Sequence, residues 1–424
     1  MNGVIMLTLI VLIALGVPIA ISLGLAAIIG IEAFTRLPLI LVAQRMFSGI
    51  DSFPLMAVPL FILAGNLMAA GGISRRLVDF ARALVGGIQG GLAASCVVTC
   101  MIFAAVSGSS VATTFAIGAI LIPAMVQNGY PRPTAAAVQA SSAELGVLIP
   151  PSIPLILYGV ATDTSIGQLF IAGFGPGLLV AGALIAFLLV YCRFMGYGNE
   201  DGSEKIPLGP AASSAIAALV MPVIVVGGIY AGVFTPTEAS GIAVFYAFVV
   251  GAFVYRELTV ARLMQVLRET AIATAVVMLI IAAAALFSFL LSRTGLPAMA
   301  TAWVTETFTS KFTFLLAVNV FLFLVGMFIE TAAAILVLAP ILVPIAIAFG
   351  VDPVHFGLIM VINLAMGMIT PPVGVNLFAA CTVARLPIER IVPALLPFFA
   401  VIVGCVMLVT YVPWISLGLR DLLY

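Results

Sequence analysis

Charged side chains and histidine are scarce in this sequence. Only 8% of the 424 residues are charged, and the chain holds a single histidine. Acidic and basic residues balance at 16 each, so the chain lacks the positive charge that attracts nucleic acids, and we expect no nucleic-acid partner. Cys96 and Cys100 lie on one predicted helix, but no histidine or second thiol pair is near them. A transition-metal site is therefore not indicated.

Apolar residues make up most of the chain. They amount to 64% of the residues, and the mean hydropathy is +1.33. A helix that crosses a bilayer needs roughly 20 such residues, so the chain has room for about a dozen spans. We predict an all-α polytopic membrane protein, in which the longest polar stretch, at 196–205, is a loop. The stretch 1–21 lacks a basic region and a clean cleavage site, which indicates a retained transmembrane helix rather than a signal peptide.

Lysine and arginine are unevenly distributed between the apolar segments. Most lie in five connections, whereas the connections at 162–169 and 232–237 have none. The positive-inside rule places the basic connections in the cytoplasm. Under this assignment the segments at about 88–128 and 312–350 each enter and leave on the same side of the membrane. Each is long enough for two helices, so each is either a re-entrant hairpin or a pair of full spans, and the two open to opposite sides.

The two halves of the chain repeat one pattern at a constant spacing. Pro150-Pro151 in LIPPSIPLIL (148–157) matches Pro371-Pro372 in ITPPVGVNLF (369–378), and the separation of Pro150 from Pro371 defines the repeat spacing. The same spacing pairs Pro123 with Pro344, Gly129 with Gly350, Gly146 with Gly367, and Ser109 with Glu330. Because the basic connections indicate opposite insertion, we predict an inverted repeat with one re-entrant hairpin and one broken transmembrane helix in each half. Such repeats are typical of secondary transporters.

Paired prolines in the middle of an apolar run predict a broken transmembrane helix. Proline removes a backbone donor and clashes with the carbonyl one turn earlier, and it pushes the preceding residue out of helical geometry. The freed backbone groups must be buried in protein or face a watery cavity, because lipid cannot bond them. The carbonyl end of such a break attracts cations, and the amide end attracts anions. Two breaks and two hairpin tips near mid-membrane would therefore form a site for Na⁺ and a carboxylate.

Polar residues mark the expected tips and breaks. These residues are Ser109, Ser110, Glu330 and Thr331 at the tips, and Gly146, Pro150, Ser152, Gly367, Thr370, Pro371 and Asn376 at the breaks. Carbonyl and hydroxyl oxygens are hard ligands that suit Na⁺. An anionic substrate would bind hydroxyls, amides and the nearby sodium ions. We predict substrate contacts from four of these residues: Ser109, Ser152, Thr370 and Asn376.

Other polar features leave alternatives open. Glu330 either caps the helix that follows it or carries a proton. Glu144 is expected to pair with a neighbouring hydroxyl or amide as scaffolding, and His355 to have a surface role at the membrane face. The stretches 74–84 and 260–271 have basic and apolar residues at helical spacing, which is typical of interfacial helices. They are either arms that link a fixed frame to a moving unit or plain connections.

Two long runs of the sequence resemble a known transporter family. The first contains GNLMAAGGISRRLVDFARALVGG, SGSSVATT and GYPRPTAAAVQASSAELGVLIPPSIPLILYG; the second is FIETAAAILVLAPILVPIAIAFGVDPVHFGLIMVINLAMGMITPPVGVNLFAA. Together they resemble the large membrane subunit of tripartite ATP-independent periplasmic (TRAP) transporters, from about residue 3 to the C-terminus. The resemblance implies an elevator-type transporter of the ion transporter superfamily, located in the bacterial inner membrane.

The resemblance also implies substrates, partners and ion sites. Members import organic acids such as C4-dicarboxylates, sialic acid and other sugar acids, driven by a sodium gradient and without an organic cofactor. They work with a small four-helix membrane subunit and a periplasmic substrate-binding protein, neither of which we expect to be fused to this chain. Carried over to this sequence, the sodium-binding residues are Ser109, Ser110, Gly146 and Pro150 in the first half, and Glu330, Thr331, Gly367, Thr370 and Pro371 in the second.

We therefore expect a sodium-coupled importer of an organic acid. A proton-coupled exchanger or antiporter, with Glu330 and Glu144 as carriers, is the alternative. An intramembrane enzyme is not expected, because one histidine and scattered cysteines do not supply a nucleophile with its base or a metal cluster. We divide the chain into N-terminal scaffold helices with an interfacial arm (1–87), a first transport repeat (88–169), central scaffold helices with an arm (170–311), a second transport repeat (312–384) and a C-terminal helix (385–424).

Overall fold

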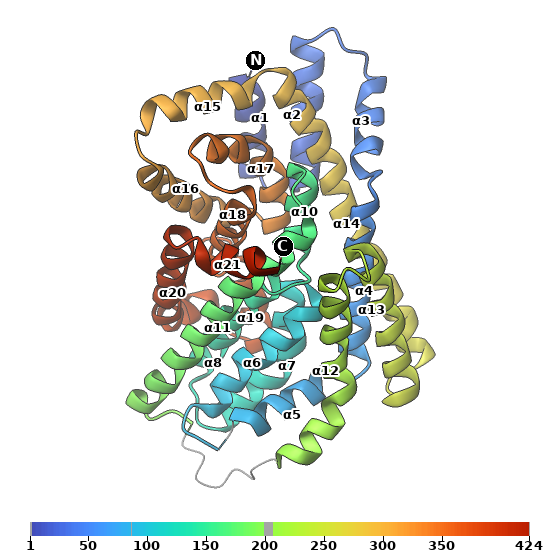
Figure 1. Cartoon of the computed structure of the whole chain (residues 1–424), viewed down its shortest axis with the longest axis vertical. Helices are drawn as coiled ribbons and strands as arrows, with labels where there is room; N and C mark the ends of the chain where they lie inside the picture. The colour runs from blue at the N-terminus through green and yellow to red at the C-terminus, as the bar shows by residue number, and fades with distance from the viewer. Residues whose placement is uncertain (1, 86, 199–206, 424) are drawn as a thin grey trace.

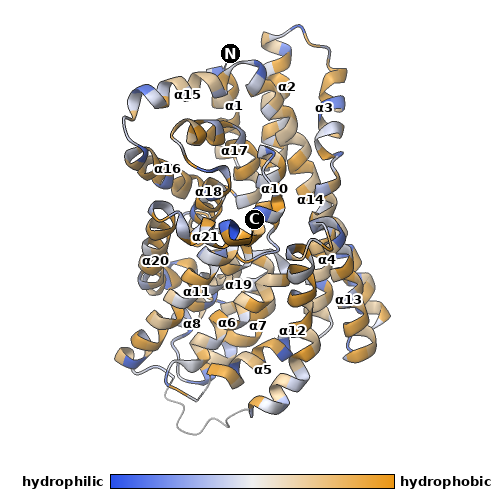
Figure 2. Ribbon diagram, in the orientation of Figure 1, coloured by the Kyte–Doolittle hydropathy of each residue, from blue (hydrophilic) through white to orange (hydrophobic). Residues whose placement is uncertain are grey.

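The computed structural model describes residues 2–85, 87–198 and 207–423, and every regular element in these ranges is helical. Among them, eight helices are long and apolar enough to cross a membrane, and a ninth span results if the bent pair Arg132–Leu148 and Ile153–Thr162 counts as one. Figure 2 shows apolar residues along nearly all the helices. The prediction of an all-α polytopic membrane protein is confirmed. The predicted loop at 196–205 lies mostly outside the described residues.

The chain begins with two short helices instead of the single one expected over 1–21. The first helix ends at Ala14, because Gly16 takes a positive φ of 79° and Pro18 has no amide to continue the hydrogen-bond ladder. The elements before the first hairpin are α1 (Asn2–Ala14), α2 (Ile19–Phe34), α3 (Ile40–Ile50), the 3₁₀ turn η1 (Phe53–Met56), α4 (Ala57–Ala70) and α5 (Ile73–Val85).

Each half of the repeat folds into a helical hairpin followed by a broken helix. The first half comprises α6 (Gly91–Ser107), α7 (Ser110–Gln127), α8 (Arg132–Ala143), α9 (Leu145–Leu148) and α10 (Ile153–Thr162). The second half comprises α16 (Lys311–Gly326), α17 (Thr331–Ala348), α18 (Pro353–Met368) and α19 (Val375–Ala384). The cis peptide bonds Pro150-Pro151 and Pro371-Pro372 lie in the gaps before α10 and α19. Both predicted breaks are confirmed.

The two halves have equivalent backbone features and opposite insertion. Pro123 and Pro344 lie inside α7 and α17, and Gly129 and Gly350 follow these helices with φ of 82° and 70°. Figure 1 shows the first hairpin in the lower half of the molecule and the second in the upper half. α10 packs against α17, and α19 packs against α7, so each broken helix reaches the hairpin of the other half. The fold is therefore an inverted repeat.

The remaining helices form the frame and the links between the repeats. They are α11 (Ile166–Met195), α12 (Leu208–Tyr230), α13 (Pro236–Val249), the π turn η2 (Val250–Val254), α14 (Val260–Arg293), α15 (Leu296–Thr307), α20 (Ile388–Tyr411) and α21 (Trp414–Leu423). α11 packs against α6, α9, α18 and α20. It therefore lies with the repeats, and the expected boundary between residues 169 and 170 falls inside it.

Two short helices lead into the hairpins from opposite ends of the molecule (Figure 1). α5 leads from α4 into the first hairpin and begins after Gly72, whose φ is 77°. α15 leads from α14 into the second hairpin and begins after Gly295, whose φ is 70°. A left-handed residue at each junction turns the chain sharply, and glycine adopts this conformation without steric cost. α5 and α15 are thus equivalent arms of the two repeats.

The second arm is not where the sequence predicted it. The stretch 74–84 forms α5 as expected, but the stretch 260–271 is the start of the continuous helix α14. Its amphipathic pattern arises because Val266 and Thr270 are buried while their neighbours at the helix end are exposed. The prediction of an interfacial arm at 260–271 is therefore wrong. α15 was missed because its sequence, LPAMATAWVTET, has no basic residue to mark it.

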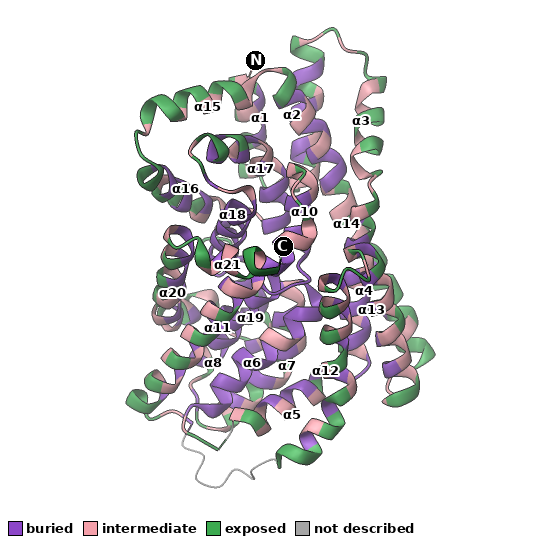
Figure 3. Ribbon diagram, in the orientation of Figure 1, coloured by how far each residue is buried: buried purple, intermediate pink, exposed green. Residues whose placement is uncertain are grey.

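Buried residues concentrate where the two repeats meet. Figure 3 shows them along α6, α7 and α18, whereas exposed residues lie mainly along the outer helices such as α12, α13 and α15. Many of the exposed residues are large and apolar: Phe194 is 85% exposed, and Val223 and Phe245 are both 70% exposed. An extended apolar surface of this kind is expected where a protein faces lipid rather than water.

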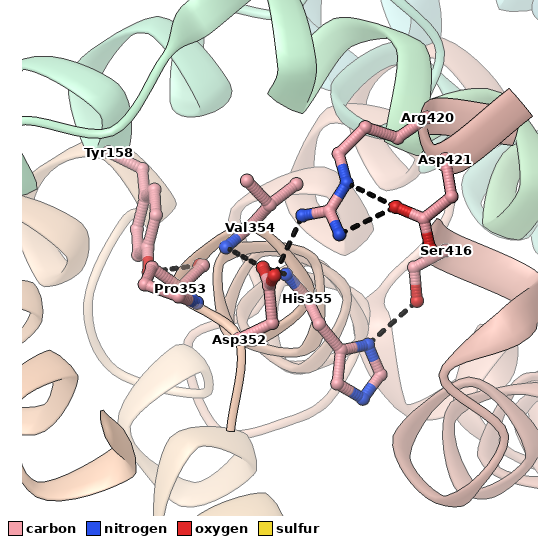
Figure 4. Close-up of polar contacts among 8 residues, drawn as sticks. All are labelled: Tyr158, Asp352, Pro353, Val354, His355, Ser416, Arg420 and Asp421. Carbon is pink, nitrogen blue, oxygen red and sulfur yellow. Dashed lines mark hydrogen bonds and ion pairs between the residues drawn. The ribbon is translucent and has the colours of Figure 1, made fainter. Parts of the chain in front are cut away.

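The C-terminal helix α21 is attached to the start of α18 by polar contacts (Figure 4). Arg420 donates to Asp352 at 2.8 Å, and Asp352 accepts from the amides of Val354 and His355 as the N-cap of α18. Nδ1 of His355 lies 2.7 Å from the hydroxyl of Ser416 on α21. The surface role expected for His355 is therefore wrong. It is only 1% exposed, because α21 packs against the helix that carries it.

Replacing Arg420 by glutamine is expected to weaken this attachment by ~1 kcal/mol or less at neutral pH, because the ion pair is partly exposed. Burial raises the pKa of Asp352, but the hydrogen bonds from Arg420, His355 and Val354 outweigh it, so the pKa lies below its ordinary value. A carboxylate with a depressed pKa stabilises the fold above its unfolded pKa, and this effect is lost as the pH falls through the folded pKa.

The difference in thermal unfolding between wild type and Arg420→Gln should therefore persist down to about pH 4 and shrink below it. Arg390→Gln is the control, because Arg390 is exposed and has no ion pair among the described residues. Equal destabilisation by both substitutions, or a difference that does not change with pH, would contradict the ion pair.

Candidate functional site

The two hairpin tips are capped by side chains at equivalent positions. Ser109 is the N-cap of α7, and its Oγ accepts from the amide of Ala112 at 3.4 Å. Glu330 is the N-cap of α17, and its Oε2 accepts from the amides of Ala332 and Ala333 at 3.0 and 3.3 Å. The first amides of a helix have no partner within it and need such acceptors. The capping role that was one alternative for Glu330 is confirmed.

Two glycines allow the hairpins to touch the broken helices. A Cβ on Gly146 would lie 2.8 Å from the carbonyl oxygen of Ser109. A Cβ on Gly367 would overlap the backbone of Gly326 and lie 2.8 Å from the amide nitrogen of Met327. The atoms that a side chain would meet belong to the backbone in both places, so they cannot rotate away. Only glycine therefore permits this approach.

A backbone hydrogen bond joins each hairpin to the helix that begins after the break. The amide of Ile153, at the start of α10, donates to the carbonyl of Gly108 at 3.2 Å, and the amide of Gly374, just before α19, donates to the carbonyl of Met327 at 3.3 Å. Ile153 and Gly374 are again related by the repeat spacing. Amides freed at the breaks are thus bonded within the protein, as the membrane interior requires. Each half brings carbonyl oxygens and a helix N-terminus together, an arrangement that can hold a hard cation and an anion.

A cavity of about 300 Å³ lies between the two tips and the frame. Ser109 and Ser110 from the first tip and Glu330 from the second contribute polar groups to its lining. α4 and α14 line its other side, where Asn66 faces the cavity and donates to the hydroxyl of Thr270 at 2.9 Å. This central cavity therefore touches both repeats and the frame.

Sequence reasoning did not identify Asn66 or Thr270 as site residues. Asn66 is the one amide in the apolar helix α4, and a polar residue within a predicted span is itself a signal of function. Thr270 and Thr274 lie one turn apart on α14, and the hydroxyl of Thr274 is buried without a hydrogen-bond partner in the described structure. All three residues lie outside the repeated pattern, which marks only the tips and breaks.

Glu144 links the two repeats through Asn376. The side-chain amide of Asn376 donates to Oε1 of Glu144 at 2.5 Å, and Thr114 lies 3.5 Å from the amide oxygen. All three residues are buried, and Oε2 of Glu144 has no partner within the described ranges. The pairing expected for Glu144 is confirmed. The second half has no copy of these polar contacts, because the residues related by the repeat spacing are Ala365, Leu155 and Ile335.

The four predicted substrate-binding residues differ in their access to the central cavity. Ser109 lines it, whereas Ser152, Thr370 and Asn376 are not among its lining residues. Ser152 caps α10 and donates to the carbonyl of Val147 in α9, before the break, and Thr370 donates to a carbonyl one turn back. Substrate contacts from Ser152, Thr370 and Asn376 stay predictions.

The remaining predicted ion-site residues lie at the tips and breaks. Ser110 and Thr331 are the buried first residues of α7 and α17, and Pro150 and Pro371 begin the two cis peptide bonds. Within the described ranges no group of three or more histidine, cysteine, aspartate or glutamate side chains could hold a metal ion.

Comparison with known proteins identifies the family. Residues 6–415 match the family described as "Tripartite ATP-independent periplasmic transporter, DctM component". The chain belongs to this TRAP family. The C4-dicarboxylate TRAP transporter large permease protein DctM of Rhodobacter capsulatus is 42% identical to it over 429 residues, which cover 98% of each chain.

Other TRAP permeases are similar over most of this chain. The isethionate TRAP transporter permease protein DctMQ of Oleidesulfovibrio alaskensis is 45% identical over 96% of this chain, which spans 64% of that longer protein. The sialic acid TRAP transporter large permease protein SiaM of Vibrio cholerae is 38% identical over 90% of this chain and 89% of its own. Because these relatives are transporter permeases, the present TRAP chain is a permease and not an enzyme.

A solved structure has a similar fold. The YdaH transporter of Alcanivorax borkumensis, whose topology is described as unusual, superposes with a TM-score of 0.65 over 90% of this chain and 89% of its own. The two sequences are only 17% identical. The similarity therefore concerns the fold of the TRAP permease and not its substrate.

Proposed function

We propose that this TRAP permease imports an organic acid anion together with Na⁺. The observation that carries the proposal is the matched contact in the two halves, where a capped hairpin meets a glycine of a broken helix. We assign one sodium site to each contact. The first would use Ser109, Ser110, Gly146 and Pro150, and the second Glu330, Thr331, Gly367, Thr370 and Pro371. Carbonyl and hydroxyl oxygens would supply most of the ligands, and Glu330 is the one acidic residue in the two sets.

The central cavity is the proposed substrate site. The N-termini of α7 and α17 start at its edge, and helix N-termini favour negative charge. Serine hydroxyls and the amide of Asn66 would orient a carboxylate, while Glu330 is engaged with its own helix. The names of the relatives refer to a C4-dicarboxylate, isethionate and sialic acid, all of which are organic acids. We infer the same chemical class for this chain.

An elevator movement of the repeats against the frame is the proposed transport step. α5 and α15 each follow a glycine with positive φ, and these glycines could serve as hinges of two arms. The tripartite family supports two partners, a small four-helix membrane subunit and a periplasmic binding protein that delivers the substrate. The corresponding location is the inner membrane of a bacterium.

Uptake into proteoliposomes that hold the permease and its small subunit tests the proposal. Labelled succinate, sialic acid and isethionate are offered with their binding proteins under an imposed Na⁺ gradient or an imposed pH gradient. We expect uptake of at least one acid that requires Na⁺ and ignores the pH gradient. Uptake driven by the pH gradient without Na⁺ would contradict sodium coupling.

A proton-coupled exchanger is the second candidate, and Glu144 favours it. Glu144 is a buried carboxyl with one unbonded oxygen in the described structure, and an ionisable side chain inside a membrane segment is a candidate proton carrier. Glu144→Gln keeps the acceptor for Asn376 but removes the titrating proton. If Na⁺ is the coupling ion, Na⁺-driven uptake should survive in Glu144→Gln. If Glu144 carries protons, uptake driven by a pH gradient should be lost in this variant.

A further inference from the structure

A second cavity lies on the face that carries the basic connections. Its volume is about 430 Å³, and it lies between α4, the start of α5 and the start of α14. The positive-inside rule places this face in the cytoplasm. Asn66 lines both this cavity and the central one. The two cavities are therefore neighbours on either side of one amide side chain.

The charges around the second cavity leave arginine side chains available. Glu257 is neutralised by Arg76, because a guanidinium nitrogen of Arg76 lies 2.7 Å from its carboxylate oxygen Oε1. The guanidinium carbon of Arg76 also lies 3.7 Å from the centre of the Tyr255 ring. Arg75 lines the cavity, is exposed, and has no ion-pair partner in the described ranges. Arg262 also lines the cavity, and its guanidinium is held by the carbonyl of Glu257 at 3.0 Å.

One acidic side chain opposes the two arginines, and it has no ionic partner among the described residues. Glu269 lines the cavity and accepts from the amide of Gln265 at 2.8 Å. Because Arg76 neutralises Glu257, the remaining charges of the lining are the positive charges of Arg75 and Arg262 and the negative charge of Glu269. The cavity therefore has a net positive charge and attracts anions.

A buried hydroxyl supports a ligand site in the same place. Ser74 lines the second cavity and is 4% exposed. Its Oγ has no hydrogen-bond partner in the described structure. Buried polar groups are nearly always bonded, so the unpaired hydroxyl of a residue that lines the cavity indicates a missing partner such as a ligand or a water.

One face of α14 lines both cavities, with mainly polar residues at the second cavity and apolar residues at the central one. Arg262, Gln265 and Glu269 line the second cavity, and the hydroxyl of Thr270 accepts from Asn66 between the two. Ala273 and Val277, further along the same helix, line the central cavity. Their spacing of three or four residues places these side chains along one face of the helix.

We propose that the second cavity is an exit site, where Arg75, Arg262 and Ser74 bind the acid group of the substrate after it passes Asn66 towards the cytoplasm. The ligand class is a small organic anion with a carboxylate or sulfonate group. The direction of movement rests on the proposed import function. The positive charge of the cavity and its affinity for anions do not depend on it, so they can be tested separately.

The charge of the exit site can be measured with thiol reagents. Ala69→Cys places a thiol in the exposed lining, and the five native cysteines are buried and will react slowly. The anionic reagent MTSES and the cationic reagent MTSET are applied from the cytoplasmic side. In Ala69→Cys combined with Arg75→Gln and Arg262→Gln, the ratio of the MTSES rate to the MTSET rate should fall about fivefold, as expected for removing two nearby charges.

Arg268→Gln in the Ala69→Cys background is the matched control. Arg268 is exposed on α14 but does not line the exit site, so its loss should change the rate ratio by less than about twofold. An equal change in both variants would show a general surface effect and would overturn the proposal. An unchanged ratio in the double arginine variant would overturn it as well.

Binding of the anion is tested by protection and by transport. Succinate, sialic acid and isethionate at millimolar concentration should slow MTSES labelling of Ala69→Cys, and the double arginine substitution should abolish the protection. No protection by any of these acids would overturn the exit site.

In counterflow from the cytoplasmic side, the double substitution should raise the half-saturating concentration of the transported acid about fivefold, and Arg268→Gln should leave it unchanged. Protection without Na⁺-driven uptake would support the anion site and reject the proposed import function.

Discussion

Gly367→Ala is expected to lower Na⁺-driven uptake about a hundredfold. The new methyl group would overlap the backbone of Gly326 and lie 2.8 Å from the Met327 amide nitrogen. The second hairpin must then move away from the broken helix, and overpacking of this kind costs ~3 kcal/mol. The same free energy corresponds to about a hundredfold loss in the population of the intact site.

Gly182→Ala is the matched control for Gly367→Ala. Gly182 lies in α11, is exposed, and has no atom within 4 Å of the position of a Cβ. Uptake by Gly182→Ala should equal that of wild type, while both proteins are checked for equal insertion and thermal stability.

The equivalent substitution Gly146→Ala should behave like Gly367→Ala, because its Cβ would lie 2.8 Å from the Ser109 carbonyl oxygen. Normal uptake by Gly367→Ala would remove the reason for assigning an ion site to the second contact.

Glu330→Ala is expected to raise the Na⁺ concentration for half-maximal uptake about tenfold, whereas Glu330→Ser should stay close to wild type. Loss of an N-cap costs ~0.5–2 kcal/mol. If the tip must become ordered again before it binds Na⁺, the same free energy is subtracted from the binding of Na⁺, so the apparent affinity for Na⁺ falls. Serine can replace glutamate because the equivalent cap of the first hairpin is already a serine, Ser109.

The serine variant separates the two roles that the sequence leaves open for Glu330. A cap needs only an oxygen that accepts from the first amides of α17, which serine supplies. A proton carrier needs a titrating group, which serine lacks. If Glu330→Ser loses uptake to the same extent as Glu330→Ala, capping alone does not explain the residue. Thermal stability of both variants, measured with and without Na⁺, shows whether the effect depends on the ion.

The repeat explains why much of the fold could be predicted from the sequence. Pro150-Pro151 and Pro371-Pro372 have strong backbone consequences in any apolar segment, and the spacing between them also relates Gly146 to Gly367 and Ser109 to Glu330. Proline and glycine restrict the chain locally, so their effects can be read without knowing the tertiary structure. The hairpins, the breaks and the caps follow from these residues.

The features that were missed depend on contacts between distant segments. The pattern at 260–271 is the same for an interfacial helix and for the exposed end of a long span, and only the packing of α14 decides between them. Asn66 becomes a site residue because α14 brings Thr270 beside it. His355 is buried because α21, which follows much later in the chain, packs against it. An amide within an apolar span marks Asn66 in the sequence, but its partner Thr270 and the packing of α14 and α21 depend on distant segments.

The crossed packing of α10 on α17 and of α19 on α7 has a consequence for the origin of the chain. Each half packs part of its broken helix on its own hairpin, but α10 covers α17 and α19 covers α7 of the other half. One half inserted alone would therefore leave these surfaces of its hairpin and broken helix uncovered. Two copies of a half could shield each other only if they entered the bilayer in opposite senses. A precursor of half the present size would thus have needed dual topology, and fusion of its gene would have fixed one orientation for each copy.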